Sequence, residues 1–167
     1  MKKGLSLLLA VAIMVSAFCM TGAAAVTTNA AIAPPARVND RIVSFPDTQP
    51  YIDSNSRTMI PVRFVSEALG ADVSWDNNTQ TAVISLDGTT VKVPVGSKTI
   101  TVTEGGNTST VTMDTKAVIK DGRTCIPIRF VAEALGSYVG YSNYYNTVEI
   151  CRETLTKDEI TRLRGYD

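Results

Sequence analysis

Residues that commonly carry chemistry are scarce in this chain. It contains no histidine, so the commonest general base and the commonest transition-metal ligand are both missing. A catalytic or metal site would have to be built from carboxylates and thiols, and the acidic residues form no dense cluster along the sequence. We therefore expect no catalytic residues, no metal ligands and no cofactor.

Two cysteines, Cys125 and Cys151, remain if Cys19 is removed with an N-terminal leader. A pair of cysteines in an exported chain favours one disulfide. Both are expected on strands of the second half of the chain, which we expect to be neighbours. Cys125–Cys151 is therefore a candidate disulfide, and two buried thiols are the alternative.

Two charged pairs share one spacing, Arg63 with Glu67 and Arg129 with Glu133. Each pair could be interpreted as a ligand-binding site. The i, i+4 spacing is also typical of ordinary ion pairs on a helix surface. Because both pairs recur at equivalent positions, we interpret them as structural.

Tyrosines are concentrated near the end of the chain. Exposed tyrosines beside a turn can stack on sugars or contact a partner loop, so Tyr138, Tyr144 and Tyr145 form a candidate binding surface. Tyr141 stands where the first half of the chain has Trp75, and we expect it in the core. The alternative is that the other three are scattered surface residues.

The N-terminus has the composition of a secretory signal peptide. A basic start, Met1–Lys3, precedes an apolar run over Leu5–Met20, and Ala23 and Ala25 provide the small residues of a cleavage site. We predict cleavage after Ala25, with a retained membrane anchor as the alternative. Residues 26–36 are rich in alanine, threonine and proline, which predicts an extended linker.

An internal repeat organises the remaining sequence. The motif Arg57–Gly70 recurs as Arg123–Gly136, at an offset of 66 residues. Upstream, we align Tyr51–Asp53 with Ala117–Ile119 at the same offset. The positions interpreted as the structural repeat motif are Arg57, Pro61, Arg63, Phe64, Glu67, Leu69, Gly70 and Trp75, and Arg123, Pro127, Arg129, Phe130, Glu133, Leu135, Gly136 and Tyr141.

Each copy predicts a strand, a two-turn helix and two further strands. In the first copy a strand over 58–61 leads into a helix over 62–69, because proline is tolerated at a helix start. Gly70 suits a left-handed helix end. The predicted strands after the helix cover 72–75 and 81–86, with a turn over 76–79.

The predicted helix has two faces. At helical spacing, Phe64, Val65, Ala68 and Leu69 form an apolar face that is expected to be buried. Arg63, Ser66 and Glu67 are expected on the solvent side.

Between the copies, two turn signals predict hairpins. Asp87-Gly88 joins strands over 82–86 and 90–94, and the turn at 104–107 joins strands over 99–102 and 109–113. Thr156–Glu159 is typical of a helix start and predicts a charged helix over 157–164.

The predicted fold class is α+β, with short antiparallel strands curved over one short helix per repeat and the two repeats packed together. The repeats cover about 37–86 and 108–151, strands over 87–107 join them, and a helical tail covers 152–167. A single unit of about 65 residues is marginal on its own, so we expect one cooperative structure.

The sequence resembles a known family at these motifs. Phe45–Asp47, Tyr51–Val65 and Glu67–Asp76, together with Asp121–Gly136, are similar to the copper amine oxidase N-terminal-like domain, also called the stalk domain. The resemblance implies a sheet curved over a helix and a secreted or cell-surface protein of a Gram-positive bacterium. It does not imply oxidase chemistry, because in the enzymes this region lies outside the catalytic domain.

These observations favour an exported, non-catalytic module of the cell envelope or extracellular space that binds a wall polymer or another surface protein. The alternatives are a carboxylate-based secreted hydrolase and a secreted protease inhibitor. With 16 basic and 16 acidic residues, no nucleic-acid partner is expected. Contact with the membrane is expected only through the signal peptide during export.

Overall fold

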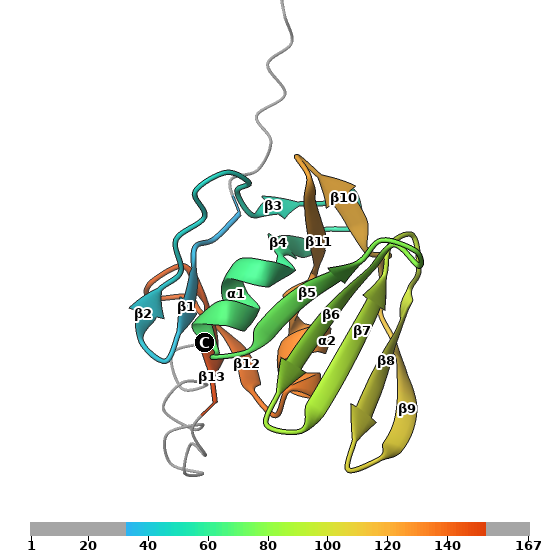
Figure 1. Cartoon of the computed structure of the whole chain (residues 1–167). Coiled ribbons are helices and arrows are strands. Elements are labelled where there is room, and N and C mark those ends of the chain that lie inside the picture. The colour runs from blue at the N-terminus through green and yellow to red at the C-terminus, as the bar shows by residue number, and fades with distance from the viewer. Residues whose placement is uncertain (1–32, 153–167) are drawn as a thin grey trace, which may run out of the picture.

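The computed structural model describes residues 33–152, which contain thirteen strands and two helices (Figure 1). The predicted signal peptide and the predicted helix over 157–164 lie outside the described residues. None of the helices described is long and apolar enough to cross a membrane.

The two sequence copies meet in one four-stranded sheet. Its order is β10 (Val118–Lys120), β11 (Arg123–Pro127), β4 (Thr58–Pro61) and β3 (Tyr51–Ile52). The inner strands β4 and β11 pair antiparallel, with Ile60 opposite Ile126. These two isoleucines occupy the same position of the motif, so the copies are related by a local two-fold rotation about this pair.

Each inner strand runs directly into a helix of seven residues, α1 (Val62–Ala68) after β4 and α2 (Ile128–Ala134) after β11. Beyond each helix the chain turns at a glycine with positive φ, 87° at Gly70 and 75° at Gly136. A side chain is disfavoured in this conformation, which explains the glycine in both copies. Helices this short depend on packing for their stability.

A strand pair follows each helix. In the first copy it is β5 (Asp72–Asp76) with β6 (Thr81–Leu86), and in the second it is β12 (Tyr138–Ser142) with β13 (Thr147–Cys151). The neighbours of the two pairs differ (Figure 1). Strand β6 continues into an antiparallel sheet through β7 (Thr89–Pro94), β8 (Thr99–Glu104) and β9 (Asn107–Thr112). Strand β13 instead pairs in parallel with β1 (Ala36–Val38), which is followed by β2 (Arg41–Ile42).

Both predicted hairpins between the copies are confirmed. Asp87 and Gly88 join β6 to β7 with φ values of 45° and 80°, as a type I′ turn requires. Gly105 and Gly106 join β8 to β9 in the same way.

One hydrophobic cluster spans the described fold. It contains Val65 and Leu69 from α1, Val131 and Leu135 from the second motif, and residues such as Ile100 of the connecting strands. The fold is mostly antiparallel sheet with two short helices, consistent with the predicted α+β class. It comprises three sheets, and one strand pair is parallel.

Two predictions about burial were wrong. Ser66 is fully buried, because α1 is packed against strands on more than one side, and Ala68 is exposed. Trp75 and Tyr141 are 38% and 43% exposed, so Tyr141 is not a core residue. Each is the fourth residue of a five-residue strand, Trp75 in Asp72–Asp76 and Tyr141 in Tyr138–Ser142.

The segment predicted as a linker joins the fold at its end. Ala33 and Ala36 are buried, and the Pro35 carbonyl accepts a hydrogen bond from the Val148 amide at 2.9 Å. Strand β1 begins at Ala36 and pairs with β13. The last residues of this segment therefore anchor the second copy.

Candidate functional site

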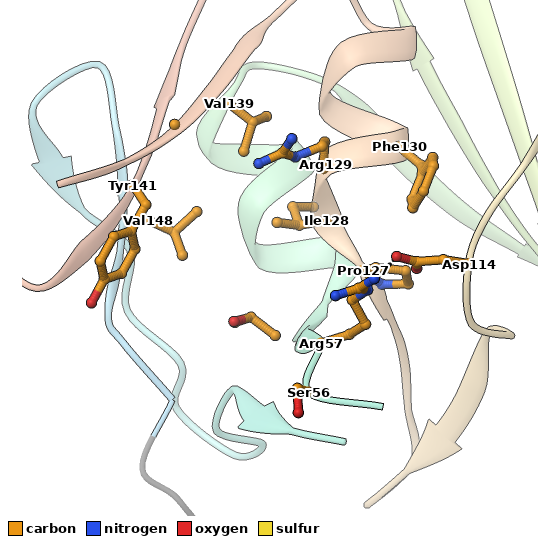
Figure 2. A pocket seen from close by; sticks show the side chains of 12 residues that line it. Ser56, Arg57, Asp114, Pro127, Ile128, Arg129, Phe130, Val139, Tyr141 and Val148 are labelled. Atoms are coloured by element: carbon orange, nitrogen blue, oxygen red, sulfur yellow. Dashed lines mark hydrogen bonds and ion pairs between the residues drawn. The ribbon is translucent and has the colours of Figure 1, made fainter. Parts of the chain in front are cut away.

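A groove of about 470 Å³ lies where the second copy meets the first (Figure 2). Its apolar part comes from the start of α2 and from the inner face of β12 and β13. Its polar part comes from the chain leading into β4 and from the segment before β10. The lining residues are Ser56, Arg57, Thr58, Asp114, Pro127, Ile128, Arg129, Phe130, Val139, Gly140, Tyr141 and Val148.

The local two-fold rotation produces a second, smaller cavity of about 90 Å³. Most residues that line it lie 66 positions before groove residues of α2, β12 and β13, and are therefore their equivalents in the first copy. Arg123 takes the place that Arg57 has in the groove. It is lined by Val62, Arg63, Val73, Ser74, Trp75, Ala82, Gly122, Arg123 and Thr124. The same place in the fold is therefore open in one copy and nearly closed in the other.

Strand pairing corrects the sequence alignment upstream of each motif. Tyr51 pairs with Met59, and Val118 pairs with Cys125. Because Met59 and Cys125 are equivalent, Tyr51 corresponds to Val118 and not to Ala117. The correct offset in this segment is 67 residues.

The corrected alignment makes Asp47 equivalent to Asp114. Each aspartate forms an ion pair with the arginine of the other copy: Asp47 with Arg123, and Asp114 with Arg57. The Arg123 Nε donates to Asp47 Oδ2 at 3.0 Å. The two ion pairs therefore connect the copies reciprocally, and the second one forms part of the groove wall.

The carboxylates do not resemble catalytic acids. The hydrogen bond from Arg123 holds the pKa of Asp47 below its usual value, which keeps it ionised. Asp114 is the one carboxylate among the groove residues, and it is paired with Arg57. A glycosidase needs two carboxyl groups facing one cleft, and this groove provides one.

The two i, i+4 charged pairs differ. Arg63 Nη1 lies 3.5 Å from Glu67 Oε1, as predicted for a helix-surface pair. In the second copy, no ion pair joins Arg129 to Glu133 or to another described residue. Instead the Arg129 side chain lines the groove, beside Ile128 and Val139 (Figure 2).

The predicted tyrosine surface is not one surface. Tyr144 and Tyr145 are 75% and 62% exposed, and their rings are 4.8 Å apart in an edge-to-face arrangement. Tyr138 lies at the opposite end of β12, and its ring covers Gly140. Tyr141, which we had interpreted as a core residue, lines the groove instead.

The two thiols are free, and the fold does not bring them together. Cys125 is on β11 and Cys151 is on β13, which belong to different sheets. Our expectation that their strands are neighbours was therefore wrong. Burial raises the pKa of the Cys125 thiol to about 11, so it stays protonated and unreactive at neutral pH.

Copper does not fit the described residues. No group of three histidine, cysteine, aspartate or glutamate residues is close enough to hold a metal ion between residues 33 and 152. The whole chain also has no histidine, the usual nitrogen ligand of copper.

Sequence reasoning identified the residues Arg57, Arg129 and Tyr141 but interpreted them as structural. The repeat itself contained a signal of the groove. At the equivalent positions Ser74 and Gly140, the second copy has no side chain, and this difference lies beside the Trp75/Tyr141 difference.

One comparison with known proteins bears on this fold. The family model described as copper amine oxidase N-terminal domain matches residues 37–150, which is more than half of the chain. This domain is a non-catalytic part of the oxidases. The match is therefore compatible with a chain that is not an enzyme.

Proposed function

Because the chain belongs to the copper amine oxidase N-terminal domain family, we propose that it is an exported, non-catalytic interaction module of the cell envelope or extracellular space. Its partner is a wall polymer or another surface protein. The groove between the copies is the observation that supports this proposal most directly. It offers an exposed aromatic ring, a cation without an ionic partner among the described residues, and an apolar floor.

The composition of the groove favours binding over hydrolysis. Its single carboxylate is neutralised by Arg57, and the chain has no histidine to act as a base. Binding sites typically combine apolar walls with a few polar groups that set orientation, and this groove has that character. Export is supported by the N-terminal sequence, with its basic start, apolar run and small residues.

The binding test is cosedimentation of the purified protein with insoluble cell walls. We expect the protein to pellet with the walls and Tyr141→Ala to reduce the pelleted fraction, because Tyr141 lines the open groove. Trp75→Ala is the matched control, since Trp75 occupies the equivalent place in the small cavity, and it should pellet like the wild type.

A protein that pellets neither with walls nor with membrane-associated surface proteins would contradict the binding proposal. Export has its own test, the intact mass of protein recovered from culture fluid. We expect a chain beginning near Val26, and a mass that retains residues 1–25 would contradict cleavage. Stoichiometric copper after dialysis, or amine oxidase activity, would contradict the non-catalytic assignment.

A further inference from the structure

We propose that the groove binds a pyranose sugar carrying a carboxylate group, with Arg129 contacting the carboxylate and Tyr141 packing against the sugar ring. This inference rests on the proposed binding function and names its ligand class. It follows from three features of the groove: its charge, its aromatic wall, and its difference from the equivalent cavity of the first copy.

The charge of the groove selects an anion. Its ionisable lining groups of fixed charge are Arg57, Asp114 and Arg129. The first two form an ion pair and compensate each other. Arg129 has no ionic partner among the described residues, so the groove carries one net positive charge. A guanidinium offers two parallel N–H donors that match the two oxygens of a carboxylate.

The wall of the groove suits a sugar ring. Tyr141 is directly opposite Val148 across β12 and β13, so both side chains lie on the same inner face. The Tyr141 hydroxyl donates to Asn146 Oδ1, which fixes the ring, and the side chain remains 43% exposed. Pyranose rings have an apolar face of C–H groups, which packs well on a fixed aromatic ring.

The opposite wall provides polar groups for the sugar hydroxyls. Ser56 and Thr58 carry hydroxyls that donate and accept, and Asp114 retains acceptor sites beyond those that bind Arg57. Sugar hydroxyls need both kinds of partner. The cavity of about 470 Å³ is within the usual size range of small-ligand sites.

The first copy shows why the site is confined to the second. At the equivalent place Arg63 is engaged by Glu67, and the cavity is about 90 Å³. Ser74 and Trp75 stand where the groove has Gly140 and Tyr141. The first copy therefore lacks both the space and the available cation, and it provides an internal control for every variant.

The test uses two pairs of sugars in which one member carries a carboxylate and the other does not. N-acetylmuramic acid is compared with N-acetylglucosamine, and glucuronic acid with glucose, by titration of ¹⁵N-labelled purified protein followed by NMR. We expect the acidic sugar of at least one pair to shift the amides of Arg129, Gly140 and Tyr141, and its neutral counterpart to bind at least tenfold more weakly. Whichever acidic sugar binds more tightly shows whether the groove prefers an amino sugar with a lactyl ether or a hexuronic acid.

The matched variants are Arg129→Gln and Arg63→Gln. We expect Arg129→Gln to weaken binding of the acidic sugar at least tenfold and Arg63→Gln to leave it unchanged, with Trp75 fluorescence and far-UV circular dichroism as checks on folding. Tyr141→Ala should weaken the acidic and the neutral sugar alike, because it removes the ring contact and not the charge. These results would separate the charge contact of Arg129 from the ring contact of Tyr141.

The inference would be overturned by equal affinity for acidic and neutral sugars, by equal effects of the two arginine variants, or by amide shifts confined to residues outside the groove. The proposed function is tested separately. A protein that pellets with walls but does not respond to any of the four sugars retains the binding function and refutes this ligand. A protein that binds an acidic sugar but pellets with no envelope fraction refutes the envelope function and retains the ligand.

Discussion

The two copies of the motif follow the same course of strand, helix and strand pair, yet the equivalent place is an open groove in the second copy and a small cavity in the first. Arg63 and Arg129 are the same residue type, whereas Ser74 and Trp75 of the first copy correspond to Gly140 and Tyr141 of the second. The first arginine is engaged within its own helix, and the second lines the groove. The shared motif therefore provides the frame, and the differing neighbours determine what the frame can bind.

The neighbouring strands reinforce this difference. Strand β6 of the first copy is extended by three antiparallel strands, whereas β13 of the second copy is flanked by β1 in parallel. In both copies, the second strand of the pair that follows the helix has a further strand on its other side. A repeat can thus keep its core while its two copies take different partners.

The largest expected effect tests whether the copies are separable at all. Leu69 and Leu135 are equivalent, both are 5% exposed, and both belong to the same hydrophobic cluster. Truncating either to alanine should lower the free energy of unfolding by about 2–5 kcal/mol, because it removes buried methyl groups and leaves a cavity. Denaturant unfolding followed by Trp75 fluorescence measures this.

Trp75 belongs to the first copy and Leu135 to the second, so Leu135→Ala is the informative variant. We expect its Trp75 transition to move to lower denaturant as far as that of Leu69→Ala. A Leu135→Ala protein whose Trp75 transition coincides with the wild type would show that the copies unfold independently.

The second prediction makes the groove of the second copy more like the small cavity of the first. Gly140→Ser introduces the residue of the first copy, and its Cβ would lie 3.0 Å from a ring carbon of Tyr138. Gly140 lies on the same face of β12 as Tyr138, whereas Tyr141 lies on the groove face, so the serine acts on the groove only through the backbone of β12. We expect the contact with Tyr138 to displace this backbone and affinity for an acidic sugar to fall about tenfold, equivalent to about 1.4 kcal/mol. Titration of the variant measures it, and Ser74→Gly is the matched control. Unchanged affinity would show that Gly140 does not set the width of the groove.

Local sequence patterns predicted the local elements. The helix predicted over 62–69 is found at Val62–Ala68, and the Asp87-Gly88 hairpin is confirmed, because turn and helix-end chemistry depends on residues close in sequence. The burial of Ser66 was not predictable in this way. Helical spacing identifies one apolar face, but α1 is packed on further sides by strands that are distant in sequence.

The candidate site was less predictable because it depends on long-range pairing. Arg57 and Asp114 are 57 positions apart, and only the register of β4 with β11 brings the two copies into reciprocal contact. Misaligning Tyr51 with Ala117 by one position also concealed the equivalence of Asp47 and Asp114. Once the offset of 67 is known, both ion pairs can be recognised in the sequence.

The third prediction concerns the ion pair in the groove wall. Arg57 and Asp114 have side chains that are 49% and 39% exposed, so their attraction is screened by solvent. Arg57→Ala should lower the free energy of unfolding by about 0.2–1 kcal/mol, the usual range for exposed pairs. A double-mutant cycle with Asp114→Ala measures the coupling. Coupling well above this range would show that the pair is a principal connection between the copies.

The smallest expected effect concerns the equivalent pair, Asp47 with Arg123, and its dependence on pH. The hydrogen bond from Arg123 lowers the pKa of Asp47 in the folded protein, so the folded state binds this proton less readily than the unfolded chain. The pair therefore contributes fully to the free energy of unfolding above the unfolded pKa of about 3.9, and its contribution disappears as pH falls through the lower folded pKa.

Asp47→Asn removes the titrating group and is the matched variant. We expect the stability difference between wild type and Asp47→Asn to be constant from pH 7 to about pH 5 and to shrink below pH 4, measured by urea unfolding across this range. Other carboxylates titrate in both proteins and cancel in the difference. A stability difference that stays constant down to pH 2 would show that the charge of Asp47 does not stabilise the fold. The contact between Asp47 and Arg123 would then contribute through packing and not through charge.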